Sequence, residues 1–260
     1  MTRRLLLYFK IKSRVNRHNR HVRLGRKKGV VLKLFYNYCI SDGINTVHTP
    51  SYNHWIYYQH GIKKRQFELF ENYTQGIIKI KSTDIVVDVG ANTGDFASNI
   101  LPNVHKVLCI EPDSKVFESL TKNLSHFPNV ELLNIAIGPQ NMFKTLYSAP
   151  DTNDSSFIKS DNLSYETETV EVKRLDLVLK NTGCVKLLKC DAEGFEPEVI
   201  SSIEGVSDKI DFVSVDCSEE RNGESTMNDV RHLLTSFGFS IICDSYLGRK
   251  ILIARRNDLT

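Results

Sequence analysis

Residues 84–97 read DIVVDVGANTGDFA, and this stretch decides the fold. The apolar, mostly β-branched residues at 85–89 are typical of a buried strand. Gly90 and Gly94 follow, and because glycine has no Cβ, a ligand can approach the backbone of such a turn closely. Apolar residues at helical spacing come next. A strand, a glycine turn and a helix in this order predict a ligand-binding loop in an α/β fold.

Asp88 indicates which ligand this loop binds. It occupies the place of the first glycine in the dinucleotide-binding pattern G-x-G-x-x-G. A carboxylate there would repel a pyrophosphate, but it would attract a cation such as the amino group or the sulfonium of S-adenosylmethionine. We therefore expect a methyl-donor site. A nicotinamide-dependent sugar oxidoreductase is the alternative, because it shares the strand–loop–helix pattern.

Strands and helices alternate from residue 81 onward, which indicates a mainly parallel sheet with helices on both faces. The expected strands cover residues 85–89, 107–110, 130–137, 170–172, 185–190, 212–215, 240–243 and 251–254. The expected helices cover residues 94–101, 114–127, 175–179, 196–203 and 227–237, the second with Ser114 as its N-cap. The last two strands have no helix between them, so we expect one antiparallel strand. A polar stretch at 143–169 separates the two halves and includes a turn at 153–156.

Acidic residues follow four of the expected strands. They are Asp88, Glu111, Asp191 with Glu193, and Asp216. Ligands of open parallel sheets bind at the carboxyl ends of the strands. Glu111 lies at the end of the second strand, where an acidic side chain accepts hydrogen bonds from both ribose hydroxyls. We expect Asp191 next to the transferred methyl group, where it would orient or deprotonate an acceptor hydroxyl; a charged helix N-terminus is the structural alternative.

Other candidate groups carry weaker signals. Asp191 and Asp216 could chelate a divalent cation, but two neighbouring carboxylates can equally share hydrogen bonds or a proton, so no metal site is predicted. His54 or His60 could act as a general base if the N-terminal segment folds over the site. The six cysteines include no C-x-x-C pair, which favours buried, reduced thiols over a zinc site.

The charge is distributed unevenly along the chain. Residues 1–41 contain twelve Lys and Arg and no Asp or Glu, whereas the rest holds 22 basic against 31 acidic residues. We divide the chain into a basic N-terminal extension (1–65) and a main domain (66–260). The extension could lie on the acidic main domain or contact an anionic membrane surface. It has no aromatic-interleaved recognition motif, so nucleic acid is not an expected partner.

Two further features belong to the extension. The aromatic run at 52–58, which holds the only tryptophan, favours a core between the extension and the main domain, with a substrate entrance as the alternative. The apolar cluster at 5–9 is too short for a signal peptide or a membrane-spanning helix. We therefore expect a cytoplasmic protein, peripheral at the inner face of the membrane if the extension binds lipid.

Four segments together resemble the FkbM family of S-adenosylmethionine-dependent methyltransferases. They are VVDVGANTGDFA (86–97), IEPD (110–113), NIAIGP (134–139) and LKCDAEGFEPEVI (188–200), and the likeness extends over residues 66–240. The resemblance implies a class I (Rossmann-like) seven-stranded sheet and O-methylation of a hydroxyl on a polyketide or sugar. Because such proteins often accompany polysaccharide-building enzymes, we expect a sugar of a polysaccharide or glycolipid as the acceptor. A non-catalytic, membrane-associated binding module is a further alternative.

The resemblance also implies roles for particular residues. Those implied to hold the methionine part of the cofactor are Asp88, Gly90, Asn92 and Gly94. Glu111 is implied to bind the ribose. Those implied near the adenine are Asp113, Asn134 and Ala136. Asp191 and Glu193 are implied at the reaction centre.

Overall fold

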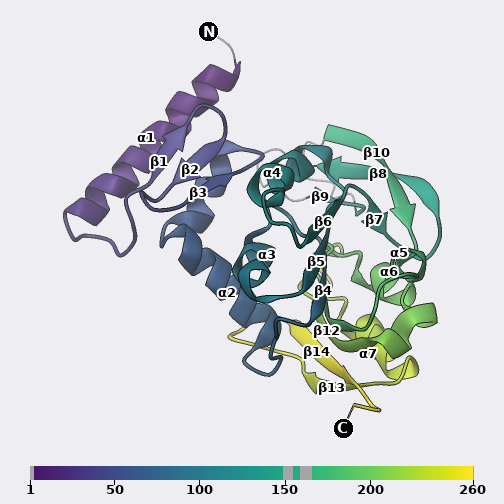
Figure 1. Ribbon diagram of the computed structural model, residues 1–260. Coiled ribbons are helices and arrows are strands. Elements are labelled where there is room, and N and C mark those ends of the chain that lie inside the picture. Colours follow the sequence, from purple (N-terminus) through teal and green to yellow (C-terminus); the bar gives the residue numbers. More distant parts are fainter. Residues whose placement is uncertain (1–2, 149–154, 159–165, 260) are drawn as a thin grey trace.

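The computed structural model describes residues 3–148, 155–158 and 166–259 (Figure 1). Its main sheet has seven strands in the order β13-β14-β12-β11-β4-β5-β6. Their bounds are Phe239–Cys243, Ile251–Arg256, Ile210–Asp216, Val185–Cys190, Ile85–Val89, Lys106–Ile110 and Val130–Leu133. Strand β14 runs antiparallel to both of its neighbours, and the strands from β12 to β6 pair in parallel. The α/β class, the seven-stranded sheet and the one antiparallel strand are confirmed.

Side chains that alternate along the strands form two cores, one on each face of this sheet. Val87, for example, belongs to the core under helices α5 (Leu175–Val178), α6 (Glu196–Ser201) and α7 (Met227–Ser236). Its neighbour Val86 belongs to the core under α2 (Ile62–Thr74), α3 (Asp95–Ile100) and α4 (Ser114–Leu124). Two short 3-10 helices, η2 (Leu101–Asn103) and η3 (Glu204–Lys209), complete this part. The sheet is therefore covered on both faces, as its apolar strands require.

A second, smaller sheet has the order β7-β10-β8-β9 and corrects the prediction of one strand over residues 130–137. That segment is divided into β6 and β7 (Ala136–Ile137). Between them, the Asn134 amide donates to the backbone oxygens of Glu111 and Pro112, which turns the chain out of the main sheet. The polar stretch contributes β8 (Met142–Ser148), β9 (Ser155–Ser156) and β10 (Glu166–Lys173). The turn expected at 153–156 lies outside the described residues, apart from its last two.

The N-terminal unit has its own core and lies to one side of the main sheet (Figure 1). Helix α1 (Arg3–Arg23) packs on an antiparallel sheet of β1 (Lys33–Phe35), β2 (Cys39–Ser41) and β3 (Thr46–His48). The aromatic run forms the 3-10 helix η1 (Tyr52–Tyr58), whose Tyr52, Trp55 and Tyr58 are buried in this core. Within the described residues, none of the Lys or Arg of α1 pairs with an Asp or Glu, whereas β3 and η1 contact the main domain through His48–Asn123 and Tyr58–Asp95 hydrogen bonds. In the part of the chain that the structure describes, no helix is both long and apolar enough to cross a bilayer.

Candidate active site

The glycine loop after β4 lies against the loop after β11. Gly90 has a φ of 72°, and its N–H donates to the backbone oxygen of Ile110 at 3.0 Å. A Cβ built on Gly90 would lie 1.7 Å from the backbone oxygen of Asp191. Only glycine fits there, because both the left-handed backbone and the close approach exclude a side chain. The loop therefore brings Gly90 and Asn92 beside Asp191.

We expected Gly94 and Asp88 to hold the methionine part of the cofactor, but in the structure both contact other parts of the protein. A Cβ on Gly94 would meet the methyl groups of Leu120 and Leu124 at 2.8 Å, so this glycine lets α4 pack closely. Asp88 is fully buried within β4, and its Oδ1 lies 2.9 Å from Nζ of Lys189. Burial raises the pKa of the Asp88 carboxyl, and Lys189 counteracts that rise. The charge that we expected to attract a cationic ligand is thus taken up by an internal ion pair.

Lys189 is a residue that sequence analysis missed. It lies in β11 directly opposite Asp88 of β4, and besides the ion pair it donates to the backbone oxygen of Gly90 at 2.8 Å. One buried lysine therefore supports both the strand and the first residue of the glycine loop. A lysine inside the apolar run VKLLKC was the available signal. Only the pairing of β4 with β11 shows what it neutralises.

Glu111 is held rigidly at the end of β5. Its Oε2 accepts from the backbone N–H of Asn92 at 2.9 Å, and its Oε1 from that of Asp113 at 3.0 Å. Burial raises the pKa of the Glu111 carboxyl to about 8, although both N–H donors oppose that rise. The carboxylate faces a pocket, as expected for a ribose ligand. Asn134 is exposed and shapes the chain beside Glu111 instead of lining that pocket.

Asp113, and not the expected Ser114, is the N-cap of α4. Its Oδ1 accepts from the N–H groups of Lys115 and Val116, since an N-cap satisfies the free donors of the first turn. Its Oδ2 accepts from the hydroxyls of Ser148 and Ser155, at 2.5 and 2.7 Å. Asp113 therefore fixes Ser155 at the rim of the pocket and does not line the pocket itself.

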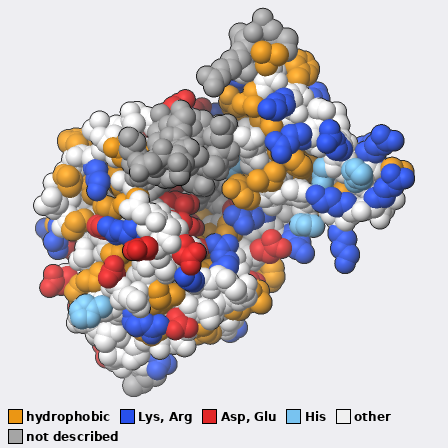
Figure 2. Space-filling view, turned by 180° about the vertical axis from the view of Figure 1, so that it is seen from behind, with side chains coloured by type: hydrophobic (Ala, Val, Ile, Leu, Met, Phe, Trp, Pro, Cys, Tyr) orange, Lys and Arg blue, Asp and Glu red, His pale blue; other side chains and the backbone are white. Residues whose placement is uncertain are grey.

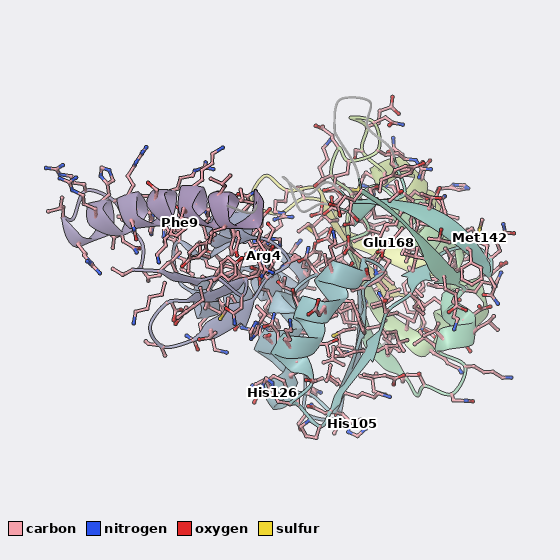
Figure 3. All side chains as sticks on the ribbon, turned by 90° about the horizontal axis from the view of Figure 1, so that it is seen from above. Arg4, Phe9, His105, His126, Met142 and Glu168 are labelled. Atoms are coloured by element: carbon pink, nitrogen blue, oxygen red, sulfur yellow. The ribbon has the colours of Figure 1, made fainter. Side chains whose placement is uncertain are left out.

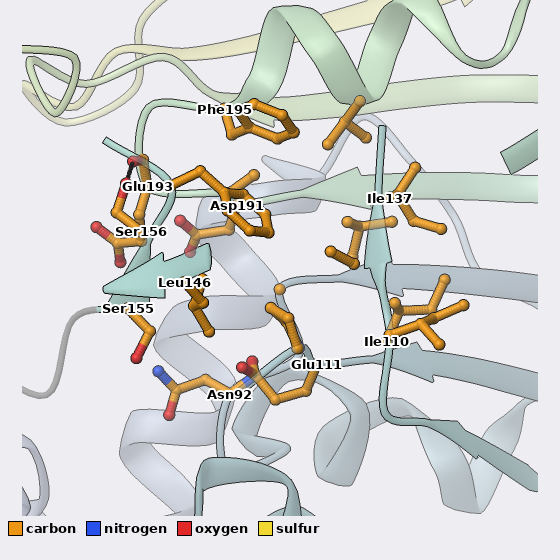
Figure 4. Close-up of a pocket in the computed structure, with 18 of the residues that line it drawn as sticks. Asn92, Ile110, Glu111, Ile137, Leu146, Ser155, Ser156, Asp191, Glu193 and Phe195 are labelled. Carbon is orange, nitrogen blue, oxygen red and sulfur yellow. Dashed lines mark hydrogen bonds between the residues drawn. The ribbon is translucent and has the colours of Figure 1, made fainter. Parts of the chain in front are cut away.

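The pocket beside Glu111 encloses about 680 Å³, part of it open to solvent (Figure 4). We call it the apolar pocket, because its walls are mostly aliphatic and aromatic. These walls include Ile110, Val116, Ile135, Ala136, Ile137, Leu146, Phe157 and Phe195. Figure 4 shows Glu111 and Asn92 on one side of this space and Asp191 and Glu193 on another. Apolar walls suit a flat ring, and the Glu111 carboxylate suits a pair of hydroxyls, so the residues present fit an adenosine group.

A second pocket adjoins the first and is more polar. The two share Gly90, Asn92, Asp191 and Glu193. We call the second the polar pocket; η1 and α2 of the N-terminal half complete it with His54, Tyr57, Tyr58, Arg65 and Tyr73. The aromatic run is therefore mostly core, as expected, while His54, Tyr57 and Tyr58 of it also line this pocket. The extension therefore contributes directly to the site.

His54, which we considered as a general base, reaches the polar pocket, whereas His60 does not line it. Burial lowers the pKa of the His54 imidazole to about 4, and the nearby Arg65 lowers it further. Its ring is therefore neutral near pH 7, with Nδ1 lacking a hydrogen-bond partner in the described structure. His105 and His126 lie at an edge of the molecule (Figure 3), and neither lines the apolar or the polar pocket.

Asp191 lies where the two pockets meet. Its Oδ2 accepts a hydrogen bond of 2.6 Å from the hydroxyl of Tyr73 and lies 4.0 Å from Nζ of Lys189. Its Oδ1 forms no hydrogen bond or ion pair in the described part of the chain. A half-exposed carboxylate with one oxygen fixed and the other available can accept a proton from a bound hydroxyl.

The loop that carries Asp191 is shaped by Glu196. The buried Glu196 carboxylate accepts from the N–H groups of Ala192 and Gly194 at 3.1 and 2.9 Å, and from the Thr226 hydroxyl at 3.0 Å. Burial raises its pKa to about 7. Glu193 adopts a φ of 50° in this loop and lines both pockets. The D-x-E-G-x-E segment therefore combines groups that face the pockets with one that folds the loop.

The structure pairs Asp216 with a cation instead of with Asp191. Its Oδ2 accepts from Arg249 at 2.6 Å, and its Oδ1 accepts from Ser218. In the described ranges, no group of three or more His, Cys, Asp or Glu could hold a metal ion. The arrangement at Asp216 is therefore an ion pair at the end of β12.

Similarity to known proteins is concentrated in this part of the chain. A model of the methyltransferase FkbM domain family matches residues 88–241, more than half of the chain. The crystal structure of a methyltransferase FkbM from Methylobacillus flagellatus KT covers 74% of this chain with a TM-score of 0.50, and the match spans 50% of that chain. At 13% sequence identity this likeness supports the fold alone.

Two curated relatives match shorter segments. A probable dimethyladenosine transferase of Dictyostelium discoideum is 28% identical over an alignment of 89 positions, which covers 29% of this chain and 28% of that protein. The dimethyladenosine transferase of Candida glabrata is 37% identical over 67 residues, which are 25% of this chain and 21% of that protein. The matches thus span less than a third of the length of either relative.

Proposed function

The chain belongs to the FkbM family of methyltransferases, and from this premise we propose that it methylates a hydroxyl oxygen of a sugar in a polysaccharide or glycolipid, with S-adenosylmethionine as donor. The observation that carries the proposal is the position of Asp191 between an apolar pocket that fits adenosine and a polar pocket that fits a hydroxylated acceptor. The family favours methyl transfer over the alternative of hydride transfer to a nicotinamide.

The donor's adenosine fits the apolar pocket. Phe195 and the aliphatic residues at 135–137 would pack on the base, and Glu111 would accept hydrogen bonds from the ribose hydroxyls. The methionine part would extend along Gly90 and Asn92, which line both pockets. When bound, S-adenosylmethionine supplies an electrophilic methyl group on a sulfonium. Asp191 and Glu193 supply negative charge near that end, which is the role first assigned to Asp88.

The acceptor hydroxyl belongs in the polar pocket, beside Asp191. The available Oδ1 of Asp191 would take the hydroxyl proton as the oxygen becomes a nucleophile, and Tyr73 would hold the carboxylate in place. The protein's main contribution is positioning, since the acceptor oxygen must be aligned with the methyl carbon. The proton then leaves Asp191 to solvent, which reaches its half-exposed side chain.

A sugar fits this pocket better than an apolar acceptor. The ring of the exposed Tyr57 offers an apolar face, and the guanidinium of Arg65 offers hydrogen-bond donors. Arg65 lies over the Tyr57 ring at 5.1 Å and 4.0 Å from the Asp95 carboxylate, so its position is fixed before the acceptor binds. Such fixed polar groups select a hydroxylated ligand.

The test is to incubate the protein and labelled S-adenosylmethionine with separate saccharide, glycolipid and RNA fractions of cells. Mass spectrometry should find one added CH₂ group on a sugar hydroxyl. Asp191→Asn should bind the donor in calorimetry but fail to transfer, whereas the surface variant Asp208→Asn should be fully active. Label in RNA instead of sugar, or binding of NAD in place of the donor, would refute the proposal. Donor binding without turnover on any fraction would indicate a non-catalytic module.

A further inference from the structure

Helix α1 presents a continuous basic face to solvent. Residues with helical spacing form one stripe along its outer side and across the turn that follows it. This stripe, the outer face, consists of Leu6, Lys10, Ser13, Arg17, Arg20 and Leu24, all exposed and flanked by Phe9 and Arg14. Figure 2 shows the Lys and Arg side chains gathered over this unit, and Figure 3 shows α1 projecting from the main domain.

The cations of the outer face have no acidic partner among the described residues. In the described part of the chain, neither a hydrogen bond nor an ion pair involves the side chains of Lys10, Arg14, Arg17 or Arg20. Over the ranges that the structure describes, every ion pair between a Lys or Arg and an Asp or Glu joins residues numbered 64 or higher. The excess of positive charge in residues 1–41 is therefore concentrated on one surface of the structure.

The fold does not need these charges. Helix α1 is held by its opposite side, where Tyr8, Ile11 and Val15 pack in the N-terminal core. Cations three and four residues apart, such as Lys10 and Arg14, repel each other on a helix surface. The helix dipole favours cations only in the last turn, which accounts for Arg20 but not for Lys10. A binding partner with dense negative charge would relieve this repulsion.

Apolar side chains on the same face narrow the choice of partner. Leu6, Phe9 and Leu24 are 55%, 52% and 53% exposed, beside the cations. An anionic bilayer binds both kinds of group, because lipid headgroups attract Lys and Arg while the acyl boundary receives shallow apolar side chains. Nucleic acid would engage only the cations. We propose that the outer face of α1 binds the surface of a membrane that contains anionic lipids.

A groove lies beside α1 on the side turned away from the outer face. Arg4 and Leu7 of α1 line it together with Ser155 and Val116 of the apolar-pocket rim, and its volume is about 1360 Å³, part of it open to solvent. A lipid-linked acceptor held by the same membrane could enter this groove from beside α1; this clause alone rests on the proposed function. Vesicle binding needs no methyl transfer, so the two proposals can fail separately.

The test is co-sedimentation of the full chain with phosphatidylcholine vesicles, with and without phosphatidylglycerol, at low and high salt. Binding should require the anionic lipid and weaken with salt. Lys10→Glu/Arg17→Glu/Arg20→Glu should lower the affinity by about a hundredfold or more. The matched control Lys79→Glu/Lys81→Glu/Lys180→Glu changes the net charge equally at exposed positions in loops outside α1 and should retain most of the binding.

A second variant keeps the proposal testable should the charge variant unfold by circular dichroism. Leu6→Ser/Phe9→Ser preserves every charge and should lose the binding that survives high salt. Equal binding to both vesicle types, no binding, or equal losses in the outer-face and control variants would overturn the proposal. Binding of an RNA or DNA duplex without vesicle binding would overturn it in favour of nucleic acid.

Discussion

The hydroxyl of Tyr73 in α2 donates a hydrogen bond of 2.6 Å to the carboxylate of Asp191, which lies 118 positions later in the chain. Tyr73 is fully buried, and burial, with the nearby negative charge of Asp191, raises the pKa of its hydroxyl well above the usual value. It therefore stays protonated and acts as a permanent donor. The helix that precedes the main sheet thus sets the orientation of the proposed catalytic carboxylate.

Tyr73→Phe should lower kcat by about tenfold with little change in the affinity for S-adenosylmethionine, because only the positioning of Asp191 is lost. Stability should fall by about 1 kcal/mol, since water can reach the half-exposed carboxylate. Tyr52→Phe is the matched control, because it removes an equally buried hydroxyl that donates to the backbone oxygen of Tyr36. Steady-state kinetics compare the two. An unchanged kcat in Tyr73→Phe would remove this residue from the mechanism.

The ion pair between Asp88 and Lys189 makes a second prediction, on stability. Lys189→Met leaves a fully buried carboxylate without its cation, which should cost about 3–5 kcal/mol of unfolding free energy. The double variant Asp88→Asn/Lys189→Met should recover a large part of that loss, because no uncompensated charge remains. Urea denaturation measures both.

Lys186→Met is the control for this pair. Lys186 lies in the same strand and contacts Asp211 at 3.2 Å, but both side chains are partly exposed, so the loss should stay below about 1 kcal/mol. If the costs of Asp88→Asn and Lys189→Met simply add in the double variant, the two groups are not coupled.

Asp88→Ala should also abolish donor binding, now through distortion of the glycine loop and not through loss of a direct contact.

Residues 84–97 and the other apolar runs made the main sheet predictable, because a fully buried strand has few alternatives. The N-terminal sheet was not predictable, since its three strands have only three residues each and lack a clear period. Glu111 and Asp191 were found because they end strands. Lys189 and Tyr73 were not found, because their roles depend on which strands pair and on where α2 packs, and neither is encoded locally.

Glu196 gives the stability a defined pH dependence. Burial raises its pKa from 4.5 to about 7, so the folded chain binds this proton more tightly than the unfolded chain does. Its contribution to the free energy of unfolding is therefore fully present below pH 4.5 and is lost as the pH rises to about 7. Glu196→Gln keeps an oxygen for the N–H groups of Ala192 and Gly194 but carries no charge.

As the pH rises from about 5 to about 8, the free energy of unfolding of Glu196→Gln should therefore increase by about 1–3 kcal/mol relative to that of the wild-type chain. Glu111, with a pKa of about 8, acts in the same direction but is present in both chains, so it cancels in the difference. Denaturant unfolding at several pH values measures this. Parallel stability curves for the two chains would mean that Glu196 titrates normally.

Gly90 tests the contact between the two loops that form the site. Alanine there would combine a left-handed backbone with a Cβ 1.7 Å from the backbone oxygen of Asp191, so the strands themselves would have to separate. Gly76→Ala is the matched control, because its φ is 65° but nothing lies within 4 Å of the added carbon. Backbone strain alone should cost about 1–2 kcal/mol in Gly76→Ala. Gly90→Ala should lose several times as much in urea unfolding, together with donor binding. Equal losses in the two variants would mean that the glycine loop and the Asp191 loop are not in contact.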